Sequence, residues 1–220
     1  MLPLGHYAAW RNGIQHADPS LENCMYDPTT KCGILNDWDL AVRANAPHAS
    51  TGRTGTIPFM AIDLLSDEYW KGILVRQYRH DLEGFQWVLA WVCMCSESHE
   101  DQGDPRLNLW RTGDRAACRQ RKVDFLLHVG AGKCHPRQTC NVEWNIAETL
   151  LLRMSIKRSR WEIEKAERRL LGHRDEDPAT EDPEVEFEEF WNILLQMSSK
   201  VPYLAGLLEL LAARTPTVER

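Results

Sequence analysis

The strongest apolar pattern in the chain lies between residues 81 and 95. One helical face carries the apolar residues Leu82, Phe85, Val88, Leu89, Val92 and Cys93. The opposite face carries Ala90, Trp91 and Met94, which are also apolar. A helix that is apolar on every side is buried on every side. The pattern predicts a central buried helix over 81–95, too short for a membrane span of about 20 residues.

Apolar residues at helical spacing predict further helices, over residues 4–14, 59–66, 114–129, 143–171, 187–195 and 204–211. The helix at 187–195 is amphipathic, and it either packs in the core or docks into a partner's groove. Two short apolar segments, at 24–26 and 32–35, flank the turn sequence DPTT, and this arrangement predicts a small β-hairpin. Residues 41–57 have no period and are predicted to form an exposed loop.

Charge is distributed in blocks along the second half of the chain. Basic residues dominate 153–174, which forms a solvated helix face, folds against the acidic stretch at 175–189, or docks an acidic partner. The acidic residues predict a linker near 175–186. These features divide the chain into a core at 1–130 and a helical part at 131–220.

Composition narrows the class of protein. Hydrophobic residues make up 43% and charged residues 26% of the 220 residues, which is typical of a globular chain. The net charge is −6 and no stretch is uniformly basic, which argues against nucleic-acid binding. The first ten residues are not typical of a signal peptide, so neither secretion nor membrane insertion is expected.

The cysteines point to a reducing compartment. There are seven, an odd number, and none forms a CxxC pair, so an intracellular location in cytoplasm or nucleus is expected. The group Cys134, His135 and Cys140 has a spacing that matches no common zinc pattern.

Four short segments together carry a chemical pattern. They are 16–23 (HADPSLEN), 36–41 (NDWDLA), 53–63 (RTGTIPFMAID) and 80–85 (HDLEGF). Protein kinases carry H-R-D-x-x-x-x-N, then D-F-G, then A-P-E. Asp18 and Asn23 keep the separation of the kinase Asp and Asn, Asp37 falls at the D-F-G aspartate, and 61–63 falls at A-P-E.

Each segment alone has a simpler interpretation. His16 would more often be a core histidine, and Asp18 and Asn23 would be loop residues that bond to nearby backbone. Residues 37–39 alone would be a turn. The order and the gaps of all four segments favour the kinase interpretation over these.

The variants DWDLA, RTGTIPFMAIDLL and HDLEGF resemble the fungal-type protein kinase family, and the resemblance covers residues 11–96. It implies a mainly α fold, namely a protein-kinase-like C-terminal lobe with a small β-hairpin at the catalytic loop and additional C-terminal helices. It also implies ATP and Mg²⁺ as cofactors and transfer of phosphate to Ser or Thr of a protein substrate.

The resemblance assigns roles to the catalytic segments. Asp18 would accept or orient the proton of the substrate hydroxyl, and Asn23 and Asp37 would hold Mg²⁺. His16 would tie the catalytic loop to the metal-binding segment. Asp81 would hydrogen-bond to the backbone of the catalytic loop.

The activation segment receives roles in the same way. Thr54, Gly55 and Thr56 belong to it, with Thr56 touching Asp18. Asp63 would form a buried ion pair with a downstream arginine.

The sequence also departs from the kinase pattern. Ser20 stands where many Ser/Thr kinases have a lysine, and Asp39 replaces the glycine of D-F-G. Only 15 residues precede His16, and no G-x-G-x-x-G occurs in the chain. We therefore expect no N-terminal lobe and a catalytic site that is incomplete as given. The alternative is a non-catalytic, pseudokinase-like module that binds a partner protein.

Overall fold

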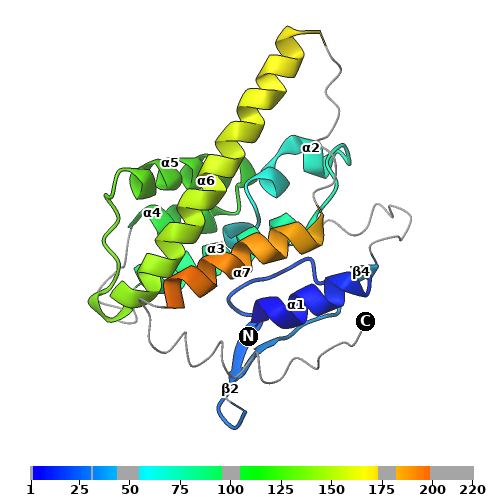
Figure 1. Ribbon diagram of the computed structural model, residues 1–220. Coiled ribbons are helices and arrows are strands. Elements are labelled where there is room, and N and C mark those ends of the chain that lie inside the picture. Colours follow the sequence, from blue (N-terminus) through cyan, green and yellow to red (C-terminus); the bar gives the residue numbers. More distant parts are fainter. Residues whose placement is uncertain (1, 31, 44–54, 96–104, 173–181, 199–220) are drawn as a thin grey trace.

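The computed structural model describes residues 2–30, 32–43, 55–95, 105–172 and 182–198, and it is mainly α-helical, as predicted (Figure 1). The α-helices are α1 (Leu2–Arg11), α2 (Asp67–Trp70), α3 (Tyr78–Met94), α4 (Pro105–Asn108), α5 (Arg115–Gly130), α6 (Asn141–Leu170) and α7 (Pro183–Ser198). The 3₁₀ turns are η1 (Ile57–Phe59), η2 (Asp63–Leu65), η3 (Leu109–Thr112) and η4 (Gln138–Cys140). No described helix is long and apolar enough to cross a membrane.

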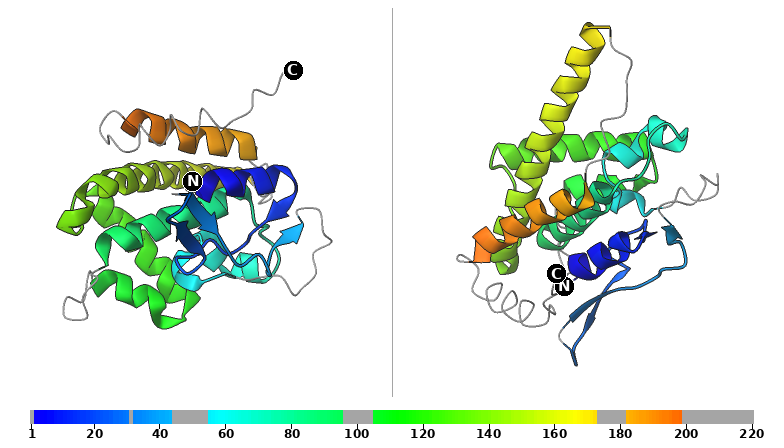
Figure 2. Two further views of the ribbon diagram at one scale, coloured as in Figure 1. Left: turned by 90° about the horizontal axis from the view of Figure 1, so that it is seen from below. Right: turned by 45° about the vertical axis from the view of Figure 1, so that its right-hand side comes forward.

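Helix α3 lies at the centre of the molecule, with α5 and α6 packed around it (Figure 2). Its Trp87 is fully buried, and the ring meets Trp110 edge-on at 5.3 Å between centroids. Trp110 in turn meets Phe125 of α5 at 5.4 Å. The predicted burial is wrong for Val92, which is exposed in the last turn of the helix, where one side reaches the surface.

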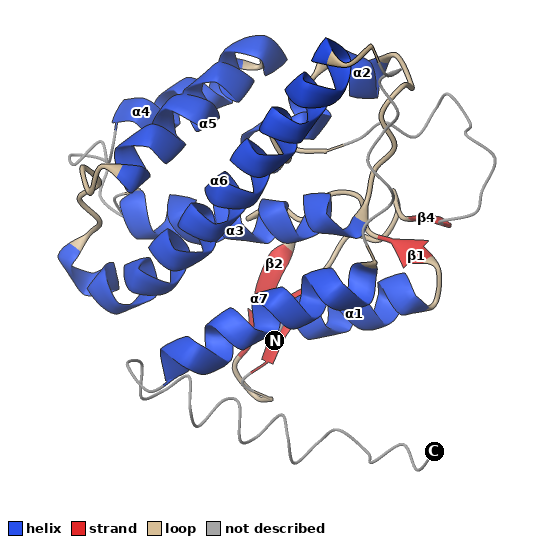
Figure 3. Ribbon diagram, turned by 45° about the horizontal axis from the view of Figure 1, so that its top comes forward, coloured by secondary structure: helices blue, strands red, loops and turns tan. Residues whose placement is uncertain are grey.

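Two short antiparallel ladders lie beside α1 (Figure 3). Strand β2 (Cys24–Asp27) pairs with β3 (Cys32–Leu35), which confirms the predicted hairpin. Its turn is held by Asp27, whose Oδ1 accepts from the Thr29 backbone N–H at 2.8 Å and whose Oδ2 accepts from Thr30 Oγ1 at 2.6 Å. Strand β1 (Ile14–Gln15) pairs with β4 (Val42–Arg43).

The prediction of a single helix over 59–66 is wrong, because the segment forms two separate 3₁₀ turns. The segment consists of η1 and η2, and between them Met60 has an extended backbone with φ −62° and ψ 144°. The two turns bury Phe59, Leu64 and Leu65 against α3 and α5. The backbone is therefore less regular than its apolar pattern suggests.

The C-terminal helices begin near the predicted positions. Helix α6 buries Ile146 and Leu150, which lie one helical turn apart on its apolar face. The linker predicted near 175–186 ends earlier than expected, because α7 starts at Pro183, a residue well suited to the first turn of a helix. Leu195 is exposed, although it continues the apolar pattern of α7. The predicted helix at 204–211 lies outside the described residues.

Lys157 of α6 pairs with Glu186 and Glu189 of α7. Glu186 is buried at this contact, although the sequence pattern assigns it to a solvated linker. Lys157 thus folds against the acidic start of α7, while Arg153, Arg160 and Arg169 are exposed, as the interpretation of a solvated helix face predicts.

Candidate active site

The two ladders hold together residues 16–23 and 36–41, which are the catalytic loop and the metal-binding segment by resemblance. Residues 16–23 connect β1 to β2, and residues 36–41 connect β3 to β4. The hairpin is extended by one hydrogen bond, in which the Asn36 N–H donates to the Asn23 carbonyl at 2.9 Å. Asn23 and Asp37 therefore lie at the same end of the hairpin, although 14 positions separate them in the sequence.

His16 joins these two segments. It is fully buried, its Nδ1 accepts from the Asp18 N–H at 3.3 Å, and its Nε2 donates to the Asn36 carbonyl at 2.7 Å. These partners assign the proton to Nε2. The ring also meets Trp38 edge-on at 4.7 Å. His16 thus fixes the position of the residue immediately before Asp37.

Asp18 is held by the activation segment. Its Oδ1 accepts from the Thr56 N–H at 2.7 Å, and its Oδ2 accepts from Thr56 Oγ1 at 3.0 Å. Gly55 precedes this contact with φ 145°, and a Cβ there would lie 2.9 Å from Met60 Cγ. Only glycine adopts this backbone without strain and fits the space. Thr54 lies outside the described residues.

The amide of Asn23 leaves an oxygen for a metal. Its Nδ2 donates to the Asp18 carbonyl at 3.0 Å, so Oδ1 is the remaining acceptor. Asp37 and Asp39 are both exposed. Ser20, in the same loop as Asp18, is buried.

Backbone strain is concentrated at this site. Among the described residues, Ala17 (φ 70°) and Asp37 (φ 59°) are the non-glycine residues with positive φ. This region is unfavourable for residues with a Cβ, although aspartate tolerates it better than most. One strained residue precedes Asp18 and the other is the candidate metal ligand. Strain of this kind is typical of functional sites.

Oxygen ligands from Asn23 and Asp37 suit Mg²⁺. This cation prefers hard oxygen donors and is commonly held by one or two carboxylates together with substrate phosphates and water. Within the described ranges, no cluster of three His, Cys, Asp or Glu side chains could hold a metal. The donors that Asn23 and Asp37 offer, one amide oxygen and one carboxylate, are of the hard kind that Mg²⁺ accepts beside phosphate and water.

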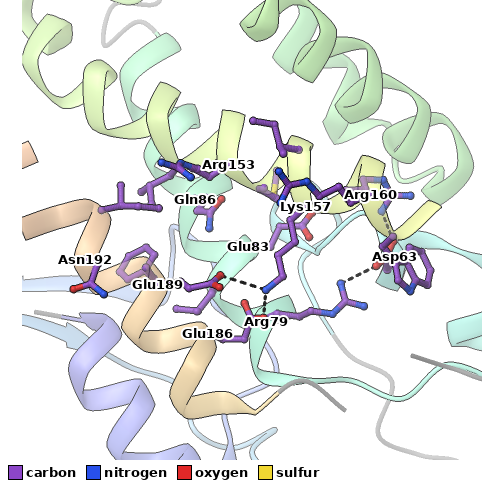
Figure 4. A pocket seen from close by; sticks show the side chains of 18 of the residues that line it. Asp63, Arg79, Glu83, Gln86, Arg153, Lys157, Arg160, Glu186, Glu189 and Asn192 are labelled. Atoms are coloured by element: carbon purple, nitrogen blue, oxygen red, sulfur yellow. Dashed lines mark hydrogen bonds and ion pairs between the residues drawn. The ribbon is translucent and has the colours of Figure 1, made fainter. Parts of the chain in front are cut away.

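Asp63 anchors the end of the activation segment to two helices (Figure 4). Its carboxylate pairs with two downstream arginines, Arg79 of α3 at 2.9 Å and Arg158 of α6. Burial alone would raise the pKa of Asp63, but the guanidinium groups of Arg158 and Arg79 hold it well below its usual range. The carboxylate stays charged at neutral pH and fixes the segment against α6.

The prediction for Asp81 is wrong in its partners. Its Oδ1 accepts from Arg76 Nη1 at 2.5 Å, and its Oδ2 accepts from His6 Nε2 at 2.9 Å and Trp10 Nε1 at 3.4 Å. These side-chain donors take the place of the expected catalytic-loop backbone, because α1 brings His6 and Trp10 directly over the start of α3.

Two buried charged residues beneath the activation segment were missed by the sequence reasoning. Glu83 Oε1 accepts from the Ile62 N–H at 2.8 Å, and Lys122 Nζ donates to the Met60 carbonyl at 2.5 Å. Burial lowers the pKa of Lys122 to about 8, and its ammonium lies 4.6 Å from the centre of the Trp87 ring. The burial of Lys122 could have been predicted, because this lysine lies within the apolar face of α5.

A cavity of about 530 Å³ lies between α3, α6 and α7, beside Asp63 (Figure 4). Leu82, Leu150 and Phe190 form apolar parts of its wall. The charged residues around it include the Asp63–Arg158 and Lys157–Glu186 pairs. These pairs hold α6 against its neighbours, so the cavity borders structural contacts of the fold.

Gly84 lets the catalytic loop approach α3. A Cβ at this position would lie 2.6 Å from Pro19 Cγ and 3.2 Å from the Phe59 carbonyl oxygen. We expect Gly84→Ala to lower the free energy of unfolding by about 1–3 kcal/mol, because a rigid ring must move. Urea unfolding measures the change. The control Gly130→Ala, where a Cβ meets nothing within 4 Å, should be neutral or slightly stabilising. Equal effects in both variants would contradict this packing.

Comparison with known proteins gives one match. The sequence model of the fungal protein kinase family matches residues 5–93, which supports the resemblance found in the motifs. No curated protein and no solved structure matches the chain. The matched part includes the catalytic loop, the metal-binding segment, the described activation segment and almost all of α3.

Proposed function

We propose that residues 5–93, as a match to the fungal protein kinase family, form the metal- and substrate-binding part of a site for phosphoryl transfer from ATP to Ser or Thr of a protein. The fold around it would be that of a kinase C-terminal lobe, with α3 as its central helix. The observation that carries the proposal is the contact of both Asp18 oxygens with Thr56, next to Asn23.

Asp18 would orient the hydroxyl group of the substrate. Thr56 donates to both carboxylate oxygens, which fixes the plane of the group, and Oδ1, with Thr56 N–H as its donor, keeps a further lone pair for the substrate. A positioned carboxylate of this kind accepts the hydroxyl proton as the phosphoryl group is transferred. Thr56 also supports a Ser/Thr substrate, by resemblance to the family.

Asn23 and Asp37 would hold Mg²⁺ on the phosphates of ATP. When bound, the metal neutralises negative charge that develops on the transferred group. The amide of Asn23 is oriented by its bond to the Asp18 carbonyl, and Asp37 is oriented by its left-handed backbone. The Asn23 amide is thus positioned before the nucleotide arrives.

The experiment compares two neighbouring carboxylates. Binding of Mn²⁺–ATP to the full chain is followed by the loss of the electron paramagnetic resonance signal of free Mn²⁺. We expect Asp37→Asn to weaken binding at least about tenfold, because a metal ligand contributes several kcal/mol of charge stabilisation. Asp39→Asn, equally exposed and two positions away, is the matched control and should change binding by less than about threefold.

Phosphate transfer to Ser- and Thr-containing peptides is measured on the same samples. Any transfer by the wild type should disappear in Asp37→Asn and persist in Asp39→Asn. A wild-type chain that neither binds Mn²⁺–ATP nor transfers phosphate would contradict the proposal, as would equal effects of the two substitutions.

A further inference from the structure

The C-terminal half of α6 extends beyond the rest of the molecule (Figures 1 and 2). Its near side contacts the body of the protein through Lys157, which pairs with α7, and Arg158, which pairs with Asp63. Its far side is exposed. The exposed side is not simply polar, although the segment carries many charged residues.

Large apolar residues repeat every seven positions on this exposed side. Ile156 is 49% exposed, Ile163 is 58% exposed and Leu170 is 86% exposed. The small residues Ser159 and Ala166 lie between them, also seven positions apart and also exposed. A seven-residue repeat of this form is the pattern by which one helix packs along another. We call these five residues the α6 seam.

We propose that the α6 seam binds the same seam of a second copy of this chain, with the two helices antiparallel. In that arrangement Ile163 faces Ala166 of the partner subunit, and Leu170 faces Ser159 of the partner subunit. The layers of Ile163 and Leu170 then each combine a large side chain with a small one, so the helices approach closely there. The arrangement is symmetric, as expected of a homodimer.

The charges beside the seam select the antiparallel orientation. Arg160 and Glu167 lie on one edge, and Glu162 and Arg169 lie on the other. Residues at these positions pair across two helices and set their direction. Antiparallel helices place Arg160 against Glu167 of the partner subunit and Glu162 against Arg169 of the partner subunit.

Parallel helices give the opposite result. They bring Glu162 against Glu167 of the partner subunit, and the like charges repel. They also stack Ala166 on Ala166 of the partner subunit, which leaves a gap beside each isoleucine layer. Charge and side-chain size therefore favour the same orientation.

Sedimentation equilibrium of the full chain tests the interaction. We expect the wild type to form a dimer in a concentration series up to about 100 μM, the range of a weak interface. Ile163→Glu should raise the dimer dissociation constant at least about tenfold, because each dimer contains the substitution twice. The control Leu127→Glu, at an α5 residue that is 69% exposed, should leave the constant unchanged. A monomeric wild type, or a dimer that survives Ile163→Glu, would overturn the proposal.

A charge exchange tests the orientation. Arg160 and Glu167 have no ion pair of their own in the described part of the chain. Arg160→Glu alone should weaken the dimer, and Arg160→Glu combined with Glu167→Arg should restore it, because antiparallel helices pair these two positions directly. Failure of the double variant to recover the wild-type constant would overturn the antiparallel arrangement.

Discussion

Replacing Asp81 by alanine is expected to lower the free energy of unfolding by about 3–5 kcal/mol, because it removes the carboxylate that neutralises the buried Arg76 charge. Asp81 is fully buried and receives hydrogen bonds from Arg76 and His6. Burial raises the pKa of Asp81, but Arg76 and the bond from His6 hold it well below its usual range. The carboxylate is thus the charged centre of the contact between α1 and α3.

Urea unfolding of Asp81→Ala gives the loss directly. Asp67→Asn is the matched control: Asp67 pairs with Lys71 at 3.3 Å on the surface, and its loss should cost at most about 1 kcal/mol. The double variant Arg76→Leu with Asp81→Leu removes both charges of this pair, so it should be more stable than Asp81→Ala. Near-equal stability of Asp81→Ala and wild type would show that this contact is unimportant.

Stability is expected to fall in two steps as the pH decreases. Burial, together with the nearby Arg79, holds the pKa of His80 well below its usual value. Below a pH of about 6.5 the unfolded chain binds a proton that the folded protein does not, and stability falls by about 1.4 kcal/mol per pH unit. Below about pH 3.9 the same argument applies to Asp63 and Asp81, whose pKa values are lowered by their cationic partners.

Glu83 acts in the opposite direction. Its pKa is raised by burial and by the charge of Asp63, so the folded protein takes up this proton first and gains stability as the pH falls toward about 4.3. Urea unfolding at several pH values separates these contributions. His80→Gln should flatten the profile between about pH 6.5 and 5, while His135→Gln, at an exposed position, should not. An unchanged slope in His80→Gln would assign the step to another group.

Local patterns in the sequence predict much of this structure. The hairpin, α5 and α6 follow from turn residues and apolar spacing, and their observed bounds lie within a few residues of the predicted ones. The proximity of the catalytic loop and Asp37 follows from the order of the motifs together with the hairpin between them. In each case the residues that determine the element lie within one short segment of the chain.

Partners of buried charges depend on distant parts of the chain. His6 and Asp81 are 75 positions apart, and Lys122 and Met60 are 62 positions apart, so no local pattern pairs them. The extended backbone at Met60 has the same origin, because contacts with α3 and α5 override the helical spacing of 59–66. Tertiary packing therefore decides which hydrogen-bond donor a buried acceptor receives, because the local sequence does not distinguish one donor from another.

The ion pair between Asp63 and Arg158 bears on how the protein is made. The two residues are 95 positions apart, and a ribosome that adds about 5–20 residues per second needs about 5–20 s to travel from one to the other. During that interval the apolar turns η1 and η2 have emerged from the ribosome without the helix that later secures them. This part of the nascent chain is therefore the natural target for chaperones during translation.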